Sequence, residues 1–202
     1  MTAKLNRVKV PNVVLVGATG SGKTTVASSL AKLLGFGVLD IDARIEQRSK
    51  RQIADIFEKD GYNGFRDLES QVIDEVSDIL NHVIVTGAGA LEREDNITYL
   101  KKLGPFIWLA TPTKEIVSRL VMKPDELRQR PLLAKAADIE DRDKRAAFLV
   151  EIIDNKLKER ESAYSEADFT LNSSHATSEI NAMLIRKMLF SYGRPKTGAD
   201  GL

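Results

Sequence analysis

The sequence contains no cysteine, and this absence excludes several kinds of site at once. Disulfide bonds, cysteine-ligated zinc or iron–sulfur centres and a thiol nucleophile all require a residue that the chain lacks. The chain has only two histidines, His82 and His175, which lie far apart and form no metal-binding pair. We therefore interpret both histidines as structural or exposed, and we expect any bound metal to be held by oxygen.

The chain also lacks an excess of charge of either sign. Thirty Lys+Arg residues offset twenty-nine Asp+Glu residues, leaving a formal net charge of +1. No overall field attracts nucleic acid or an anionic membrane, so any recognition of phosphate must be local. No apolar run approaches membrane-spanning length, and residues 1–11 lack the apolar segment of a signal peptide. We expect a cytoplasmic protein with no nucleic-acid or membrane partner.

A chain of 202 residues, 43% of them hydrophobic, is long enough for one compact domain. We predict an N-terminal extension over residues 1–11, a single domain over 12–190 and a flexible tail over 191–202. The tail is rich in glycine, proline and polar residues. Residues 122–143 form the most irregular internal stretch, with many charges and two prolines, and we interpret them as a mobile lid.

Short β-branched runs alternate with amphipathic helical patterns along the predicted domain. A strand buried on both faces is predicted at residues 13–16, and further strands are predicted at 38–42, 82–86, 106–109 and 169–171. Apolar residues recur at helical spacing over 23–34, over 65–79 and after residue 112. This alternation predicts an α/β fold with three layers, in which a central five-stranded parallel sheet lies between helices and ligands bind at the carboxyl ends of the strands.

Residues 17–24 read GATGSGKT and lie between a predicted strand and a predicted helix. The pattern G-x-x-x-x-G-K-[ST] in that context is typical of a phosphate-binding loop. Its backbone N–H groups surround phosphate oxygens, Lys23 reaches the β- and γ-phosphates, and the Thr24 hydroxyl binds Mg²⁺. The alternative is a turn that only reverses the chain, but the strand, helix, lysine and threonine together favour the phosphate loop.

Asp40 and Asp42 end the second predicted strand. Alternation along a strand predicts that both side chains point to the same side, toward the phosphate loop. Together they can hold a Mg²⁺-bound water and a substrate hydroxyl. The alternative is that Asp42 caps a helix beginning near Ala43. The nearby phosphate loop favours the functional interpretation.

Two arginines are candidates for binding an anionic substrate. Arg66 opens the predicted long helix and lies three residues before Glu69, so it forms either a surface ion pair or an anion clamp held by Glu69. Arg160 has either an internal carboxylate or a ligand as its partner, because its helical stripe faces inward. The stripe consists of Leu149, Ile153, Leu157, Arg160 and Tyr164.

Two loops supply further candidates. The third predicted strand is followed by Gly87, Ala88 and Gly89, which offer backbone N–H groups at the ligand-binding edge, with a plain turn as the alternative. In the lid, Arg130 precedes a proline and two leucines that we expect to be exposed, residues 131–133. Such an arginine can close over ATP and neutralise charge on the transferred phosphoryl group.

Taken in order, these residues resemble the shikimate kinase family, small P-loop enzymes of the nucleoside-monophosphate-kinase structural class. The resemblance covers about residues 13–167. The matching blocks are GSGKTT at 20–25, the DxD pair at 40–42, IADIF at 53–57, FRxxE at 65–69, RPLL at 130–133 and RxxxY at 160–164. Six blocks in the right order are far more specific than a phosphate loop alone.

The resemblance implies transfer of the ATP γ-phosphate to the 3-hydroxyl of shikimate, a step toward chorismate and the aromatic amino acids. We expect ATP and shikimate as partners, Mg²⁺ as cofactor and a monomer. The resemblance implies an ATP site formed by Gly20, Ser21, Gly22, Lys23, Thr24, Thr25, Arg119 and Arg130, with Arg119 on the adenine side. It implies a shikimate site formed by Asp42, Arg66, Gly87, Ala88, Gly89 and Arg160. It assigns metal binding to Thr24 and Asp40, and catalytic roles to Lys23, Asp42 and Arg130.

Several features depart from the family pattern. Ala88 stands in the middle of a loop that is normally Gly-Gly-Gly; if that position requires a positive φ, alanine is strained there and shikimate affinity should fall. Tyr62 replaces an acidic residue, an arginine near the adenine is missing around His175, and the lid between Arg119 and Arg160 is longer than usual. These changes bear on substrate affinity more than on nucleotide binding.

Two other functions stay open at this point. A related small-molecule kinase, such as a gluconate-kinase-like enzyme, would keep Lys23 and Thr24 but has no evident need for two substrate arginines together with the RPLL lid. A non-catalytic relative that binds nucleotide or a partner is supported by Ala88 and Tyr62. Against it, every residue assigned to ATP, Mg²⁺ or substrate charge is present in this sequence.

Overall fold

The structure, a computed structural model, describes residues 10–174 and 176–192 of the chain. Five parallel strands form one sheet in the order β2-β3-β1-β4-β5. The strands are β1 (Val13–Val16), β2 (Gly37–Asp40), β3 (His82–Val85), β4 (Phe106–Ala110) and β5 (Phe169–Asn172). The predicted five-stranded parallel sheet is confirmed. Because β1 is the central strand, the loop that follows it opens at the middle of the carboxyl edge.

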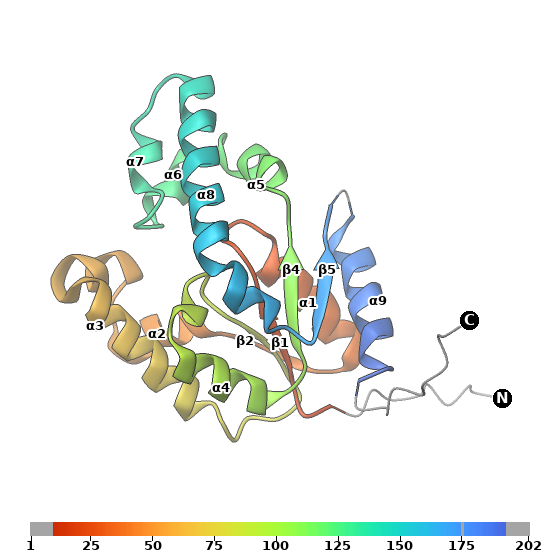
Figure 1. Ribbon diagram of the computed structural model, residues 1–202. Coiled ribbons are helices and arrows are strands. Elements are labelled where there is room, and N and C mark those ends of the chain that lie inside the picture. The colour runs from red at the N-terminus through yellow and green to blue at the C-terminus, as the bar shows by residue number, and fades with distance from the viewer. Residues whose placement is uncertain (1–9, 175, 193–202) are drawn as a thin grey trace.

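Helices cover both faces of this sheet (Figure 1). Helices α1 and α9 pack together on one face, whereas α2, α3 and α4 lie on the other, and α8 rises from the sheet toward α5, α6 and α7. Their bounds are α1 (Lys23–Leu34), α2 (Ile41–Ser49), α3 (Ile53–Glu75), the 3₁₀ helix η1 (Ala90–Glu92), α4 (Glu94–Leu103), α5 (Thr113–Leu120), α6 (Pro124–Arg128), α7 (Ala134–Ala137), α8 (Arg142–Ser165) and α9 (Ser178–Leu189). The fold is therefore the predicted α/β/α arrangement.

The central strand is buried on both faces, as its β-branched sequence predicts. Val14 and Val16 belong to a core shared with α2, α3 and α4, whereas Val13 and Leu15 belong to the core on the side of α1 and α9. Successive side chains alternate between the two cores because a strand has a period of two. This double burial fixes β1, and with it the loop that begins at Gly17.

The second strand ends two residues earlier than predicted. Helix α2 begins at Ile41, and Asp40 is its N-cap, with Oδ1 accepting from the backbone N–H groups of Asp42 and Ala43. The prediction of a strand to residue 42 is wrong, and so is the alternative in which Asp42 is the cap. An Asp at the end of a strand can satisfy the free N–H groups of a following helix, so strand and helix adjoin with no loop.

Arg66 does not open a helix. Helix α3 begins at Ile53, twelve residues before Phe65, and contains a break at Gly61, where φ is 71° and ψ is −174°. Glycine adopts this conformation without a steric penalty, so the chain changes direction and then resumes the helix. Arg66 consequently lies within α3, on the part that packs under the sheet.

The predicted lid, residues 122–143, contains more regular secondary structure than its irregular sequence predicts. Residues 122–143 contain α6 and α7, and their last two residues belong to α8. Leu133 is 3% exposed and packs in a core with side chains of α5 and α8, whereas Leu132 is 45% exposed. The expectation that both leucines are exposed is therefore wrong for Leu133, because the lid builds its own small core against α8.

The predicted domain limits fall partly outside the described residues. Residues 1–9, His175 and 193–202 lie there, so the extension and the flexible tail stay predictions. Within the described part, the Tyr192 ring lies 6.2 Å from that of Phe169. Among the helices that the structure describes, none is long and apolar enough to cross a membrane.

Candidate active site

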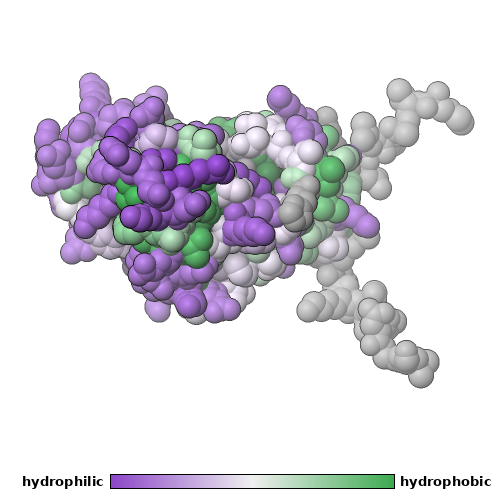
Figure 2. All heavy atoms as spheres, turned by 90° about the horizontal axis from the view of Figure 1, so that it is seen from above, coloured by the Kyte–Doolittle hydropathy of each residue, from purple (hydrophilic) through white to green (hydrophobic). Residues whose placement is uncertain are grey.

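A cleft of about 600 Å³ opens at the carboxyl edge of the sheet. It is lined by the loop after β1, the starts of α2 and α3, the loop after β3, the lid and one side of α8. Seen from above, this end of the molecule is mostly hydrophilic, with apolar side chains showing in the recesses (Figure 2). A cleft of this size at this edge can hold small phosphorylated ligands.

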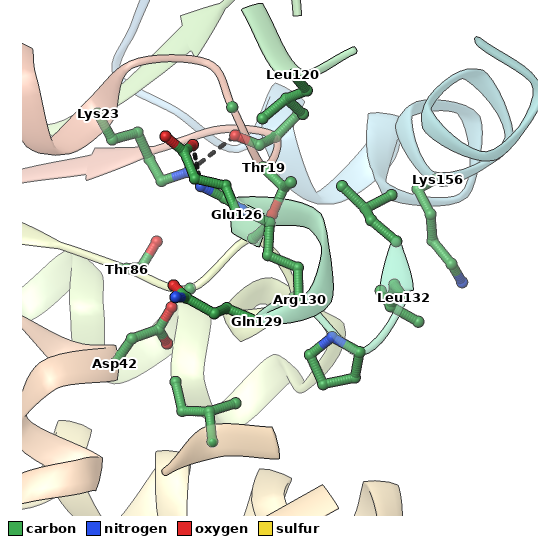
Figure 3. Close-up of a pocket in the computed structure, with 18 of the residues that line it drawn as sticks. Thr19, Lys23, Asp42, Thr86, Leu120, Glu126, Gln129, Arg130, Leu132 and Lys156 are labelled. Atoms are coloured by element: carbon green, nitrogen blue, oxygen red, sulfur yellow. Dashed lines mark hydrogen bonds and ion pairs between the residues drawn. The ribbon is translucent and has the colours of Figure 1, made fainter. Parts of the chain in front are cut away.

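The loop after β1 has the geometry of a phosphate cradle. Gly20 and Gly22 adopt φ values of 76° and 93°, which residues other than glycine rarely adopt. The Lys23 ammonium donates to the carbonyls of Gly17 (2.8 Å) and Ala18 (2.9 Å) and is almost fully buried (Figure 3). Burial lowers the pKa of Lys23 to about 8, although the carboxylates of the site partly oppose that shift.

Thr24 and Asp40 supply neighbouring oxygen atoms at one side of the cleft. The Thr24 hydroxyl donates to Asp40 Oδ2 at 3.3 Å, while Oδ1 of Asp40 caps α2. A hydroxyl and a carboxylate are a donor set that suits Mg²⁺, which is commonly held by one or two protein oxygens plus waters and phosphates. Within residues 10–174 and 176–192, no group of three or more His, Asp or Glu side chains forms a metal cage.

Three further residues expected at the ATP site lie near the loop. The Arg119 Nη1 group donates to the carbonyls of Gly20 (3.4 Å) and Ser21 (3.2 Å), and Nη2 pairs with Glu115. Arg119 thus lies against the phosphate loop itself. Thr25 lines the cleft, whereas Ser21 is buried and does not.

Asp42 faces the same cleft from the first turn of α2. Its Oδ1 is buried and has no hydrogen-bond partner among the described residues, and a Cβ placed on Gly87 would lie only 2.7 Å from it. Burial, followed by the negative charges of Glu69 and Asp40, raises the pKa of Asp42 to about 7. A carboxyl with such a pKa can both take and hold a proton near neutral pH.

Arg66 and Arg160 come together in the cleft from different helices. Arg66 Nη1 donates to Glu69 Oε2 at 2.6 Å, and the side chains of this pair are 5% and 0% exposed. The surface ion pair considered for Arg66 is therefore wrong, because the pair is buried. Arg160 donates from Nε (2.9 Å) and Nη2 (2.5 Å) to Glu92 Oε1. Arg160 has an internal carboxylate as its partner, as one of the two alternatives predicts, and it also lines the cleft. Its role as a ligand-binding group stays a prediction.

The loop after β3 places Gly87, Ala88 and Gly89 on the cleft wall. Among the described residues other than glycine, only Lys50 and Asn81 have a positive φ, so Ala88 carries no such strain. The condition under which we expected Ala88 to lower affinity is not met. The carbonyl of Ala88 instead accepts a hydrogen bond from the Tyr164 hydroxyl at 3.2 Å.

Two further residues lie at the site: Gln129, which was not picked out from the sequence, and Tyr62, which was noted only as a departure from the family pattern. Gln129 extends from the lid into the same cleft as Asp42, next to Arg130, whose Nη2 lies 3.8 Å from Glu126 (Figure 3). The Arg66 guanidinium lies over the ring of Tyr62 at 4.9 Å, so the residue that departs from the family pattern contacts the site. No periodicity or motif assigns Gln129 or Tyr62 to the site, because only the fold brings them next to it.

Comparison with known proteins gives consistent results at the level of sequence. The sequence model of a family described as shikimate kinase matches residues 19–189. The chain is 38% identical over 185 residues to a shikimate kinase of Caldanaerobacter subterraneus subsp. tengcongensis, covering 91% of this chain and 99% of that protein. It is 40% identical over 159 residues to a shikimate kinase of Gloeobacter violaceus, covering 79% and 81%.

Solved structures agree. The structure of shikimate kinase from Acinetobacter baumannii in complex with shikimate superposes with a TM-score of 0.80 at 32% identity, covering 93% of this chain and 97% of that one. Shikimate kinase from Aquifex aeolicus superposes with a TM-score of 0.69 at 28% identity, covering 89% and 96%.

Proposed function

The chain belongs to the shikimate kinase family, and we propose that it transfers the γ-phosphoryl group of ATP to the 3-hydroxyl of shikimate. The products are shikimate 3-phosphate and ADP, on the route to chorismate and the aromatic amino acids. The observation that carries this proposal is one cleft that is lined by a phosphate loop, by Asp42 and by two buried arginines. We further propose that the protein acts in the cytoplasm as a monomer.

The ATP side of the cleft is the loop that ends at Lys23. Backbone N–H groups of the loop and the N-terminus of α1 favour phosphate oxygens. Lys23 exchanges its two carbonyl partners for oxygens of the β- and γ-phosphates and neutralises charge there. Arg119, which contacts the loop, and Arg130, which extends from the lid, add positive charge around the same group. In this proposal the lid closes over ATP and brings Arg130 to the transferred phosphoryl group.

Thr24 and Asp40 are the residues that would hold Mg²⁺, since their oxygens adjoin at the phosphate loop. When bound, the ion would offset the charge of the β- and γ-phosphates. Asp40 keeps its second oxygen on the α2 backbone, so its position is fixed by the fold.

The shikimate carboxylate is proposed to bind between Arg66 and Arg160, with backbone N–H groups of residues 87–89 beside it. Two guanidiniums can supply parallel hydrogen bonds to one carboxylate, and that geometry favours a planar anion. Glu69 fixes Arg66 through a buried ion pair. A ring hydroxyl then lies toward Asp42, between the arginines and the phosphate loop.

Asp42 is proposed to act as the general base. It accepts the proton of the 3-hydroxyl, the resulting oxygen forms a bond to the γ-phosphorus, and the bond to the β–γ bridging oxygen breaks to release ADP. The orphaned buried Oδ1 and the pKa of about 7 support this assignment. Bound reactants held in line account for a large part of the rate enhancement.

The direct test is release of ADP from ATP and Mg²⁺ with and without shikimate, with gluconate and nucleoside monophosphates run in parallel. Shikimate-dependent ADP is expected. ADP release that depends on gluconate or a nucleotide instead would keep the kinase and reject the arginine clamp for shikimate. ATP binding without turnover on any acceptor would reject the proposal in favour of a non-catalytic relative.

Replacing Arg160 with alanine is expected to raise the KM for shikimate by roughly 10- to 100-fold and the KM for ATP by less than about threefold. The reason is that Arg160 lines the shikimate side of the cleft from α8. Steady-state kinetics with each substrate varied in turn provides the measurement. Lys158→Ala, an exposed position on the same helix, is the control. Equal rises for both substrates would show that Arg160 has only a structural role.

Replacing Gly89 with alanine is expected to raise the KM for shikimate at least about tenfold, without strain in the backbone. Gly89 has a φ of −106°, but an added Cβ would lie 1.9 Å from Arg66 Nη2, so the arginine must move. A double-mutant cycle with Arg66→Ala checks this cause. If the Gly89→Ala loss persists in full once Arg66 is absent, displacement of the arginine is not the explanation.

A further inference from the structure

One carboxylate, Glu92, connects the two arginines of the proposed clamp. Arg160 donates to Glu92 Oε1 from Nε at 2.9 Å and from Nη2 at 2.5 Å, and Arg66 Nη2 lies 3.5 Å from Glu92 Oε2. Glu69 pairs with Arg66 from the same helix, α3. Glu92 therefore links an arginine of α3 to an arginine of α8 through its two oxygen atoms.

The backbone that carries Glu92 is held in place by contacts of its own. Glu92 ends η1, whose first two residues are buried in the core against α3 and α4. The next residue, Arg93, pairs with Asp67 of α3 at 2.7 Å. Asn96 of α4 donates to the carbonyl of Ala90 at 2.9 Å. Because η1 is anchored independently, Glu92 can act as a fixed point for two longer and more flexible side chains.

Glu92 does not occupy the place of the substrate. The active-site cleft is lined by Arg66 and Arg160 but not by Glu92. Glu92 lines a neighbouring surface pocket together with Tyr62, and Arg160 forms part of the wall of both. Arg160 uses its Nε and Nη2 groups for Glu92, while its side chain also lines the active-site cleft. The carboxylate thus supports the arginines from the side of the second pocket.

The same contact limits the charge of the clamp. Arg66 and Arg160 face Glu69 and Glu92, so each guanidinium has a carboxyl partner before any substrate binds. The carboxyl partners reduce the electrostatic repulsion that two unpaired guanidiniums at this distance would have. We therefore expect the two arginines to bind a substrate carboxylate through directional hydrogen bonds more than through a large excess of positive charge.

Resting on the proposed function, we propose that Glu92 is a positioning residue for the shikimate carboxylate, holding the guanidiniums of Arg66 and Arg160 at the spacing that one carboxylate requires. No motif of the sequence marks this role. Glu92 is the last residue of η1, which connects the loop after β3 to α4.

The test compares Glu92→Ala and Glu92→Gln with the parent protein. Glu92→Ala removes both the charge and the acceptor and is expected to raise the KM for shikimate roughly 10- to 100-fold, because small displacements of binding groups have effects of that size. Glu92→Gln keeps the length and one acceptor oxygen, so its rise is expected to be smaller. The KM for ATP should stay within about twofold in both variants.

Glu94→Gln is the matched control, because it removes the same charge two residues further along, at the start of α4. Its KM for shikimate should equal that of the parent protein. A second readout uses the carboxamide of shikimate as the acceptor. If Glu92 acts through the carboxylate site, Glu92→Ala should raise the KM for shikimate far more than the KM for the carboxamide.

Three results would overturn the proposal. A lower KM for shikimate in Glu92→Ala would show that Glu92 competes with the substrate for the arginines. An unchanged KM would show that the arginines hold their places without it, and equal losses for shikimate and its carboxamide would show a general structural role. If Glu92→Ala does not fold, Glu92→Gln carries the test and must itself raise the KM. Absence of shikimate-dependent turnover in the parent protein would instead reject the proposed function.

Discussion

Replacing Lys23 with alanine is expected to lower kcat/KM for ATP by at least about 10³-fold, which corresponds to ~4 kcal/mol of transition-state stabilisation. Phosphoryl transfer requires little covalent chemistry from the protein, so positioning and charge neutralisation supply most of the rate enhancement. Lys23 is the first residue of α1, and its ammonium already lies over the phosphate loop, held by the carbonyls of Gly17 and Ala18. Alanine leaves the loop without that charge.

The assay for this variant is ADP release at saturating shikimate with ATP varied. Lys32→Ala is the control, since Lys32 is an exposed lysine in the last turn of the same helix and should leave the rate unchanged. Thermal melting of both variants separates a loss of chemistry from a loss of folding. If the folded Lys23→Ala variant keeps more than about a tenth of the parent rate, the phosphate-loop assignment is wrong.

The sequence predicted best those elements whose signals are local. The run at Val13–Val16, the glycines after it and the helix that begins at Lys23 are adjacent in the chain and specify strand, turn and helix in succession. The inward position of Arg160 was predictable for the same reason, because residues at helical spacing share one face. Burial of both faces of the central strand follows from its run of apolar residues.

The sequence pattern did not predict where β2 ends or where α3 begins, because more than one local structure fits the same residues. The run at residues 38–42 satisfies a strand pattern, yet the Asp40 side chain accepts the N–H groups of the following helix and ends the strand early. Likewise, Gly61 does not stop α3 but bends it, so that Arg66 lies inside a helix that began at Ile53. The local sequence allows several element boundaries, and packing against the sheet determines which of them forms.

Contacts between residues that are distant in sequence could not be predicted from the sequence alone. Glu92 and Arg160 are 68 residues apart, and only the fold brings them within hydrogen-bond distance. The burial of Leu133 also could not be predicted, because side chains of α5 and α8 complete the core around it only in the folded structure. The conformation of Ala88 also could not be read from composition, since glycine at a family position does not by itself establish a positive φ.

Replacing Asp42 with asparagine is expected to lower kcat by about 10²- to 10³-fold while changing the KM for shikimate little. Asparagine has nearly the same size and keeps an oxygen for the substrate hydroxyl, but it cannot accept a proton at neutral pH. We expect the loss to be in kcat because Asp42 is placed to accept a proton: burial and two neighbouring carboxylates raise its pKa to about 7. Asp74→Asn, an exposed position on α3, is the control and should behave as the parent protein.

The pH profile distinguishes a base from a residue that only binds. A general base works in its ionised form, so kcat/KM for shikimate should rise with pH, with an apparent pKa of about 7, and then level off as Asp42 becomes fully ionised. The pKa of Lys23, about 8 in the protein without nucleotide, predicts a fall in kcat/KM for ATP at higher pH, as that lysine loses its proton. In Asp42→Asn the rise near pH 7 should disappear while the fall remains. A rise that persists in the variant would assign that ionisation to another group, and Asp42 would then bind the hydroxyl without taking its proton.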